Sequence, residues 1–342
     1  MRMVGRGLSL ACVLLCTAAA HATATPDVDS AALLRKFEPV LYFHAEEDWA
    51  PERADAFVAR ARVEKQTARG KWVAQTGALP TSTKGCTFKP CYRFNLPCAL
   101  RSGDACYEKA SATITNWKEP VVYGRLLEVP AGTPPPAGFA TAPRYLARYW
   151  LFYEFNDWRS PKGRLWQTHE ADWESVTVGL GDALQPLFAA YSQHCSGTIR
   201  PWAGVTKRAA SHPVDYVAVG SHANYFTNAP SSTKLNECRN RYLDSARAKT
   251  LVKLAADRLV DRTGTAHASG PAGLAGTTPL ELVELNAPLP AWASFPGLWS
   301  EGQLLWIGRT PTRFTSIFES GGPATPNWNA TSIPSGWHAA SS

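Results

Sequence analysis

The residues best suited to chemistry lie between positions 157 and 174, where Asp157, His169, Asp172 and Glu174 supply three carboxylates and one imidazole. Asp172 and Glu174 are two positions apart, so if they belong to a strand, their side chains lie on the same face of the sheet. Two carboxylates entering a mostly apolar face repel each other and are costly to desolvate, and a cation relieves both effects. Oxygen ligands with one imidazole suit Mg²⁺, Ca²⁺ or Mn²⁺ better than structural zinc. We therefore expect a divalent-cation site, with a hydrated, solvent-facing pair of carboxylates as the alternative.

Four further residues are candidates for the rim of this site: His44, Glu170, His194 and His222. His194 and His222 each end a strand-like segment, so both can reach one edge of a sheet. The acidic and aromatic run around His44 adds to the same rim. If the cation activates a bound water, Glu170 or His222 would act as the base. Motifs for a nucleophile elbow, a phosphate loop or dinucleotide binding are missing from the sequence, so catalysis stays undecided and a binding role is favoured.

The elements that must position these residues are mostly strands. Alternating or aromatic, β-prone runs predict strands at 145–155, 173–180, 186–192 and 214–219, separated by turn residues. Pro51 opens a predicted helix over 51–65. Leucine spacing predicts one or two amphipathic helices near 231–262. We expect an all-β fold, an antiparallel β-sandwich with helical insertions, forming a single domain over 23–342.

The N-terminal residues and the cysteines point to an oxidising compartment. Arg2 and Arg6 precede an apolar run and small residues, which is the pattern of a signal peptide over 1–22. A secreted or periplasmic chain then keeps an even number of cysteines, and we expect them to form disulfides, with the pairing open among the first four. A zinc site is the alternative, but no C-x-x-C pair supports it. These six candidates are Cys86, Cys91, Cys98, Cys106, Cys195 and Cys238.

Composition excludes several classes of protein. The chain has 342 residues, of which 45% are hydrophobic and 18% charged, and this is too apolar for a disordered protein. No later stretch is long and apolar enough for a transmembrane segment. The formal net charge is +7, or +5 without Arg2 and Arg6, and +4 of it lies in residues 231–262, which hold eight Lys or Arg and four Asp or Glu. This segment either packs on the sandwich with a basic outer face or docks on an anionic membrane surface. An exported chain without a basic and aromatic motif is not expected to bind nucleic acid.

Three segments carry a family resemblance: THEADWESVTV, AYSQH and HPVDYVAVGSHANYF. With the early segment FEPVLYFHAEEDWAP, they resemble the family of the vacuolar protein sorting-associated protein sixty-two. A more distant likeness is to the necrosis- and ethylene-inducing-like proteins, secreted cytolysins with a β-sandwich. Their H-x-x-D-W-E signature matches His169, Asp172 and Glu174, after an aromatic strand that ends in Asp157. The resemblance implies that these positions hold a divalent cation.

Taken together, the sequence predicts a secreted, divalent-cation-binding protein that binds a surface lipid or glycan, in a toxin-like manner similar to the cytolysins. Two alternatives stay open. A secreted metal-dependent hydrolase would use a cation-bound water beside a base. A structural envelope protein would use the cation to hold its loops together. The sequence leaves the oligomeric state undetermined.

Overall fold

The computed structural model describes residues 28–87, 90–96, 117, 119–159, 165–194, 196–228, 231–232, 260–286, 288–300, 304–307, 324–334 and 337–339. The predicted signal peptide, Cys98, Cys106, Cys195, Cys238 and most of the predicted helical insertion lie outside these ranges. At the two ends of that insertion, β13 (Ser231–Ser232) and β14 (Val260–Asp261) pair as antiparallel strands. Among the described residues, no helix has the length and apolar character needed to cross a membrane.

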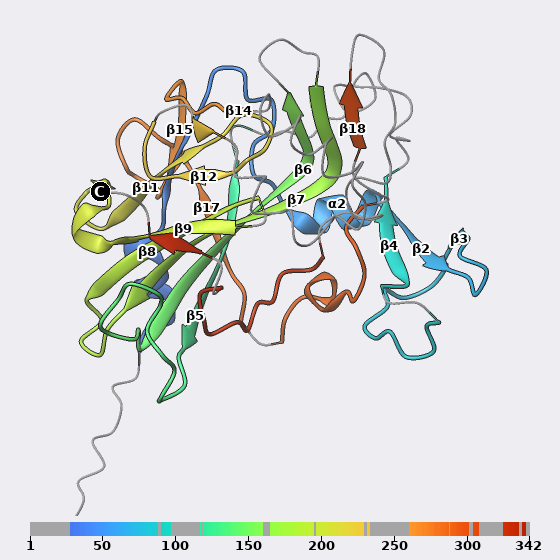
Figure 1. Cartoon of the computed structure of the whole chain (residues 1–342), viewed down its shortest axis with the longest axis horizontal. Helices are drawn as coiled ribbons and strands as arrows, with labels where there is room; N and C mark the ends of the chain where they lie inside the picture. The colour runs from blue at the N-terminus through green and yellow to red at the C-terminus, as the bar shows by residue number, and fades with distance from the viewer. Residues whose placement is uncertain are drawn as a thin grey trace, which may run out of the picture.

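The long aromatic runs form the centre of the largest sheet in the described part of the chain. β6 and β7 form a long antiparallel hairpin that continues through β8 and β9 as a meander (Figure 1). β5 pairs with the other side of β6, and the edges add the parallel strands β17 and β19, while β18 pairs with β7. The bounds are β5 Val121–Glu128, β6 Tyr145–Arg159, β7 Leu165–Leu180, β8 Pro186–Gln193, β9 Ser196–Pro201, β17 Glu281–Glu284, β18 Leu304–Ile307 and β19 His338–Ala339.

A second sheet lies against one face of this meander. Its order is β10-β11-β1-β15-β16, with β12 pairing on β11, and the β1–β11 and β15–β16 pairs are parallel. The hydroxyl of Tyr191 on β8 donates to the carbonyl of Val214 on β11 at 2.8 Å, which links the two sheets through the core. The bounds are β1 Val40–Phe43, β10 Lys207–Arg208, β11 His212–Val217, β12 Asn224–Tyr225, β15 His267–Gly270 and β16 Thr278–Pro279.

Helices are short and lie on the sheets. α1 (Ser30–Phe37) begins at Asp29, whose carboxylate accepts from the N–H of Ala32 at 2.9 Å, a normal N-terminal cap. The carbonyl of Leu34 accepts from the hydroxyl of Tyr149 on β6, which fixes the helix to the large sheet. α2 is Ala54–Arg60, and single 3₁₀ turns cover Trp202–Gly204 and Ala291–Ser294.

The all-β class predicted from the sequence is confirmed, and the four strands predicted between 145 and 219 are present. One prediction is wrong in part: the helix expected over 51–65 ends at Arg60. Residues Arg62–Gln66 form β2 instead, because they pair with β3 (Trp72–Ala74) and β4 (Tyr92–Asn95) in a small three-stranded sheet. The expected antiparallel pairing holds in the central meander, whereas both large sheets gain parallel strands from distant segments.

Disulfide formation is supported for one pair of the predicted cysteines. Cys86 and Cys91 are bonded, with their Cα atoms 5.9 Å apart. Cys91 is fully buried directly before β4, so the bond ties the preceding loop to the small sheet.

Candidate functional site

His169 and Asp172 come together because the chain leaves regular strand geometry between them. In an unbroken strand, residues three apart lie on opposite faces. Ala171 has a left-handed φ of 51°, which breaks the alternation at that point. Asn156, the register partner of His169 on β6, donates to Oδ2 of Asp172 at 3.2 Å, and the charge of His169 acts on the Asp172 carboxyl. Glu170 is directed elsewhere, since its Oε2 accepts from the N–H of Leu96 at 3.2 Å.

The ring of His169 is held in one tautomer. Its Nδ1 lies 2.9 Å from the carbonyl oxygen of Ala171 and 3.1 Å from that of Glu170. A carbonyl oxygen only accepts hydrogen bonds, so Nδ1 carries a proton, and in the neutral form of the ring the lone pair is on Nε2. A metal-binding histidine is commonly prepared in this way, with its other ring N–H bonded to a backbone carbonyl.

His222 is held between two buried carboxylates. Its Nδ1 lies 3.0 Å from Oδ2 of Asp172, and its Nε2 lies 3.5 Å from Oε1 of Glu47. The ring also stacks on Tyr153, with centroids 3.8 Å apart and an interplanar angle of 4°. Although burial alone lowers the pKa of His222, the charge of Glu47 and the hydrogen bonds to both carboxylates raise it to about 9. The side chain is therefore an imidazolium at neutral pH.

Two of the three carboxylates that the sequence predicts as ligands have pKa values that are shifted in opposite directions. Burial raises the pKa of Asp172, but the hydrogen bond from His222 and the charges of His169 and His222 outweigh it and leave that pKa lowered. Burial and the neighbouring charge of Asp172 raise the pKa of Glu174 well above its ordinary value. Glu174 accepts a hydrogen bond from the hydroxyl of Ser192, and no described residue forms an ion pair with it.

His194 belongs to a second buried group next to the first. Its Nε2 lies 2.8 Å from Oδ2 of Asp261, and its ring stacks on Trp158 with centroids 4.5 Å apart. Asp261 also accepts from the hydroxyls of Ser221 at 2.6 Å and Tyr225 at 2.5 Å. Burial raises the pKa of Asp261, but His194 and these hydrogen bonds together lower it. Because Ser221 directly precedes His222, the two predicted rim histidines do lie in neighbouring groups.

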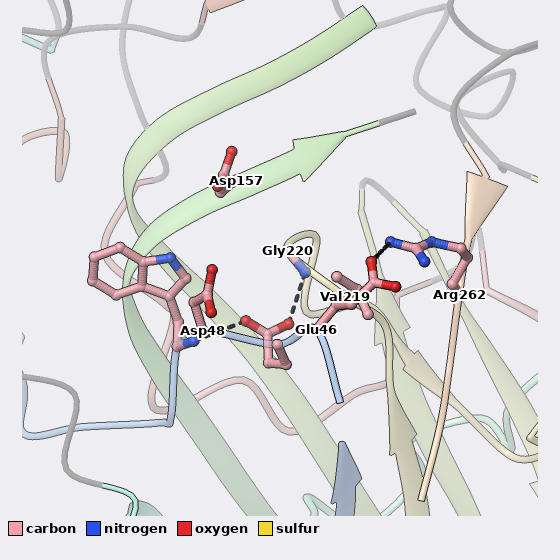
Figure 2. A pocket seen from close by; sticks show the side chains of 8 residues that line it. Glu46, Asp48, Asp157, Val219, Gly220 and Arg262 are labelled. Carbon is pink, nitrogen blue, oxygen red and sulfur yellow. Dashed lines mark hydrogen bonds and ion pairs between the residues drawn. The ribbon is translucent and has the colours of Figure 1, made fainter. Parts of the chain in front are cut away.

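Glu47 connects this interior to an acidic pocket of about 290 Å³ (Figure 2). Its Oε2 accepts from the N–H of Gly220 at 2.7 Å and its Oε1 from the N–H of Trp49 at 2.9 Å, so the carboxylate is fixed at the back of the pocket. Arg262 pairs with Glu46 at 2.8 Å on one side. The pocket is lined by Glu46, Glu47, Asp48, Trp49, Asp157, Val219, Gly220 and Arg262.

Asp157 lies at a different place from the other three predicted ligands. Asp157 lines the acidic pocket, and Figure 2 shows it on the β6–β7 hairpin across the pocket from Arg262. The position beside Asp172 is occupied by Asn156 instead. His44, the remaining predicted rim residue, accepts from the N–H of Glu46 at Nδ1, 3.0 Å away, and so lies next to this pocket.

Within the described part of the chain, several buried polar atoms around Asp172 and Glu174 have no hydrogen-bond partner. Nδ2 of Asn224 lies 3.3 Å from the Ser192 hydroxyl that serves Glu174, whereas Oδ1 of Asn224 is unpartnered. Oδ1 of Asn156, the hydroxyl of Tyr153 and Oδ2 of Asp215 are unpartnered as well. Buried polar groups are normally paired, so this concentration of oxygen acceptors is unusual. As the side chains stand in the described residues, however, no three His, Cys, Asp or Glu groups are arranged to hold a metal ion.

Sequence reasoning missed part of this interior. Asn156, Tyr153, Asp215 and Asp261 contribute to it, but each reads as an ordinary strand or loop residue. The one usable signal was alternation: Asp215 is the charged position of a strand that is otherwise apolar, which is costly unless the side chain serves a purpose. Burial raises the pKa of Asp215 well above its ordinary value.

The chain was compared with protein families, curated proteins and solved structures. No protein-family model matches it, and no curated protein does. Among solved structures, one similar to it is Necrosis and Ethylene inducing Protein 2 from the causal agent of cocoa's witches' broom disease. The two are 19% identical over 57% of this chain and 67% of that chain, with a TM-score of 0.27. This similarity is too weak to carry an argument, and the resemblance to the vacuolar sorting-associated family finds no support in the comparisons.

Proposed function

We propose that this chain is an exported protein that binds one divalent cation through His169, Asp172 and Glu174, and that the cation helps it to bind a surface lipid or glycan. The observation that carries the proposal is the buried Asp172–Glu174 pair. The imidazolium of His222 pairs with Asp172. Glu174 has only the hydrogen bond from the Ser192 hydroxyl among the described residues, and its pKa is strongly raised. A cation beside both carboxylates would favour the ionised form of Glu174.

The donors suit a hard cation. Two carboxylates, the Nε2 lone pair of His169 and the unpartnered amide oxygens of Asn156 and Asn224 form an oxygen-rich set. Mg²⁺, Ca²⁺ and Mn²⁺ prefer such ligands. The side chains must draw together to coordinate an ion, so binding should tighten this part of the core. Asp157, the fourth ligand predicted from the sequence, would have to leave the wall of the acidic pocket to join them.

A hydrolase is less well supported, for reasons visible at the two expected bases. His222 is held between Asp172 and Glu47 with a pKa of about 9, so at neutral pH it already carries the proton that a base must take up. Glu170 is fully buried and bonded to the N–H of Leu96. A binding role needs neither residue to titrate.

The test is a thermal melt of the mature protein in chelator and then with added Mg²⁺, Ca²⁺ or Mn²⁺. At a hundredfold excess over the dissociation constant, a cation that binds only the folded state should stabilise it by about 2.7 kcal/mol. Asp172→Asn should abolish this gain, whereas the matched control Asp182→Asn, in an exposed turn, should keep it. If no cation raises the melting temperature of the wild type and calorimetry detects no binding, the proposal fails.

The surface ligand needs a separate experiment. Binding to anionic and neutral vesicles and to a glycan array should be measured with the preferred cation and with chelator. The proposal expects binding that requires the cation and is lost in Asp172→Asn. Cation binding without any vesicle or glycan binding would instead favour the structural role, in which the ion only holds loops together.

A further inference from the structure

The outer face of the second sheet carries a pair of stacked tyrosines. On β11, Asp215 is fully buried and Val217 packs in the main core, so Tyr216 between them points to the opposite, outer face. Tyr42 on β1 is its register partner, and the two rings stack with centroids 5.6 Å apart and an interplanar angle of 21°. Both tyrosines are half-buried, so part of this aromatic surface is open to solvent.

The tyrosine pair offers both a ring face and a hydroxyl to a ligand. One face of the Tyr42 ring contacts Tyr216, and the other lies toward Ala268 on β15, whose methyl group is too small to cover it. The hydroxyl of Tyr216 makes no hydrogen bond to any described residue and is not a buried atom, so it faces solvent. An apolar ring with a hydrated hydroxyl is the combination that makes tyrosine common at binding interfaces.

Arg208 brings a fixed positive charge to the same face. It lies on β10 opposite His212, which is four residues before Tyr216 on β11 and therefore shares its face. Its Nη1 donates to the hydroxyl of Tyr42 at 2.7 Å, and its Nη2 donates to the carbonyl oxygen of Ala275 at 2.7 Å. These bonds use two of the five guanidinium N–H groups. In the described chain, none of the nitrogens of Arg208 is both buried and unpartnered, so the remaining N–H groups are open to solvent.

The charge of Arg208 is not balanced by an acid. Arg208 forms no ion pair with any residue that the structure describes. Lys207, the preceding residue on β10, has no acidic partner among these residues either, and its Nζ donates to the carbonyl oxygens of Trp202 and Val205. Both side chains are half-buried rather than enclosed. This edge of the second sheet should therefore attract anions.

We propose that Arg208, Tyr42 and Tyr216 bind an acidic glycan, one that carries uronic acid carboxylates. The carboxylate accepts hydrogen bonds from the open N–H groups of Arg208, a sugar ring packs on the face of Tyr42, and the Tyr216 hydroxyl bonds a sugar hydroxyl. Donors held in fixed directions suit such a ligand better than a lipid surface. Docking on a bilayer uses exposed apolar side chains, and the one large exposed hydrophobic residue in the described chain is Val73, in the small sheet.

This contact is separate from the cation-dependent binding proposed above, because none of the three residues belongs to the Asp172 cluster. We expect it to persist in chelator and in Asp172→Asn, whereas the cation-dependent binding is lost under both conditions. The two proposals can therefore fail independently of each other.

Isothermal titration calorimetry in chelator tests the site, with oligogalacturonate and hyaluronan as the uronate probes. Fully methyl-esterified oligogalacturonate is the matched ligand without charge and should bind at least about tenfold more weakly than the acid form. Arg208→Met should weaken uronate binding by at least about tenfold, and Tyr216→Phe, which removes one neutral hydrogen bond, by about threefold. The control is Arg144→Met, which removes an arginine already paired with Glu128 at 2.6 Å and should leave binding unchanged.

A thermal melt of each variant separates lost binding from lost structure. Tyr216→Phe removes a hydroxyl that bonds no described residue, so it should melt at the temperature of the wild type even if Arg208→Met, which loses the bonds to Tyr42 and Ala275, melts lower. The proposal is wrong if neither uronate probe binds the wild type, if the methyl ester binds equally well, or if both folded variants bind as the wild type does. Phosphatidylglycerol vesicles that bind through Arg208 while the uronates do not would also overturn it, in favour of a lipid.

Discussion

A single histidine balances the charge of the polar interior. His222 is fully buried in a left-handed backbone conformation, with φ of 52°, and contacts Asp172 on one side and Glu47 on the other. Glu47 in turn receives two backbone N–H groups, from Trp49 and Gly220, so the carboxylate is well solvated by the protein itself. Removing the histidine leaves Asp172 and Glu47 without the positively charged imidazolium ring that lies between them.

We expect His222→Gln to destabilise the fold by roughly 3–5 kcal/mol, the usual cost of removing one member of a buried ion pair. Urea denaturation of variant and wild type measures the difference. His212→Gln is the matched control, since His212 is half-buried and makes one hydrogen bond to the carbonyl of Glu38. If both variants lose the same free energy of unfolding, the ion pairs of His222 contribute no more to stability than the single hydrogen bond of His212.

A different buried acid predicts a pH dependence. Burial and the neighbouring charge of Glu154 raise the pKa of Glu52 from 4.5 to about 9, although Arg60 lowers it. Since the folded state holds this proton more tightly than the unfolded state, the stabilising contribution is complete below pH 4.5 and is lost as pH rises through about 9. Glutamine mimics the protonated form at every pH.

The melting temperature of Glu52→Gln, relative to that of the wild type, should therefore increase steadily across this pH window. Glu128→Gln is the control, because Glu128 is exposed and pairs with Arg144 at the surface. A difference between Glu52→Gln and the wild type that is constant with pH would mean that Glu52 is ionised in the folded protein at neutral pH.

At the scale of elements, the loop that carries His222 is pressed against the β6–β7 hairpin. The N–H of Asp157 donates to the carbonyl of Gly220 at 2.8 Å. A Cβ atom on Gly220 would lie 2.2 Å from the carbonyl oxygen of Asp157, and its φ of +69° is unfavourable for other residues. The loop can approach β6 this closely only because position 220 has no side chain.

Gly220→Ala should consequently cost severalfold more than Gly273→Ala. Gly273 has a similar φ of +83° but nothing within 4 Å of the added Cβ, so its substitution should cost about 1 kcal/mol for the conformation alone. Urea denaturation of the two variants compares them directly. Similar costs would imply that the loop moves away from β6 without penalty, and that the contact between Gly220 and Asp157 does not fix the position of His222.

The elements were more predictable than the site. Alternation and aromatic β-prone runs were enough to predict β6, β7, β8 and β11, because side-chain period follows directly from strand geometry. The same periodicity correctly placed Asp172 and Glu174 on one face. It did not predict the left-handed conformation of Ala171, because no local sequence pattern encodes it. That conformation turns His169 toward Asp172 and turns Glu170 away. Glu47 lies far from His222 in sequence, and their contact depends on the parallel pairing of β1 with β11, which brings the loops after both strands to the same end of the second sheet.

At the scale of the whole molecule, the central meander divides two kinds of chemistry. One face carries the buried acids Asp172 and Glu174, and the other carries Arg125 and Arg148, which form no ion pair with any residue that the structure describes. The sheet thus separates the acids, whose charge His222 balances, from the two arginines.

The last prediction concerns the oxidation state of the whole chain. Cys86 and Cys91 are bonded, and the sequence predicts that the other four cysteines downstream of the signal peptide are oxidised too. Titration of thiols in the exported protein, denatured without reductant, should therefore find almost none. Cys86→Ser should release one thiol, that of Cys91, whereas Cys86→Ser combined with Cys91→Ser should release none and should cost about 2 kcal/mol of stability for a loop this short. Two or more free thiols in the wild type, or no new thiol in the single variant, would contradict the prediction and with it the expectation of an oxidising compartment.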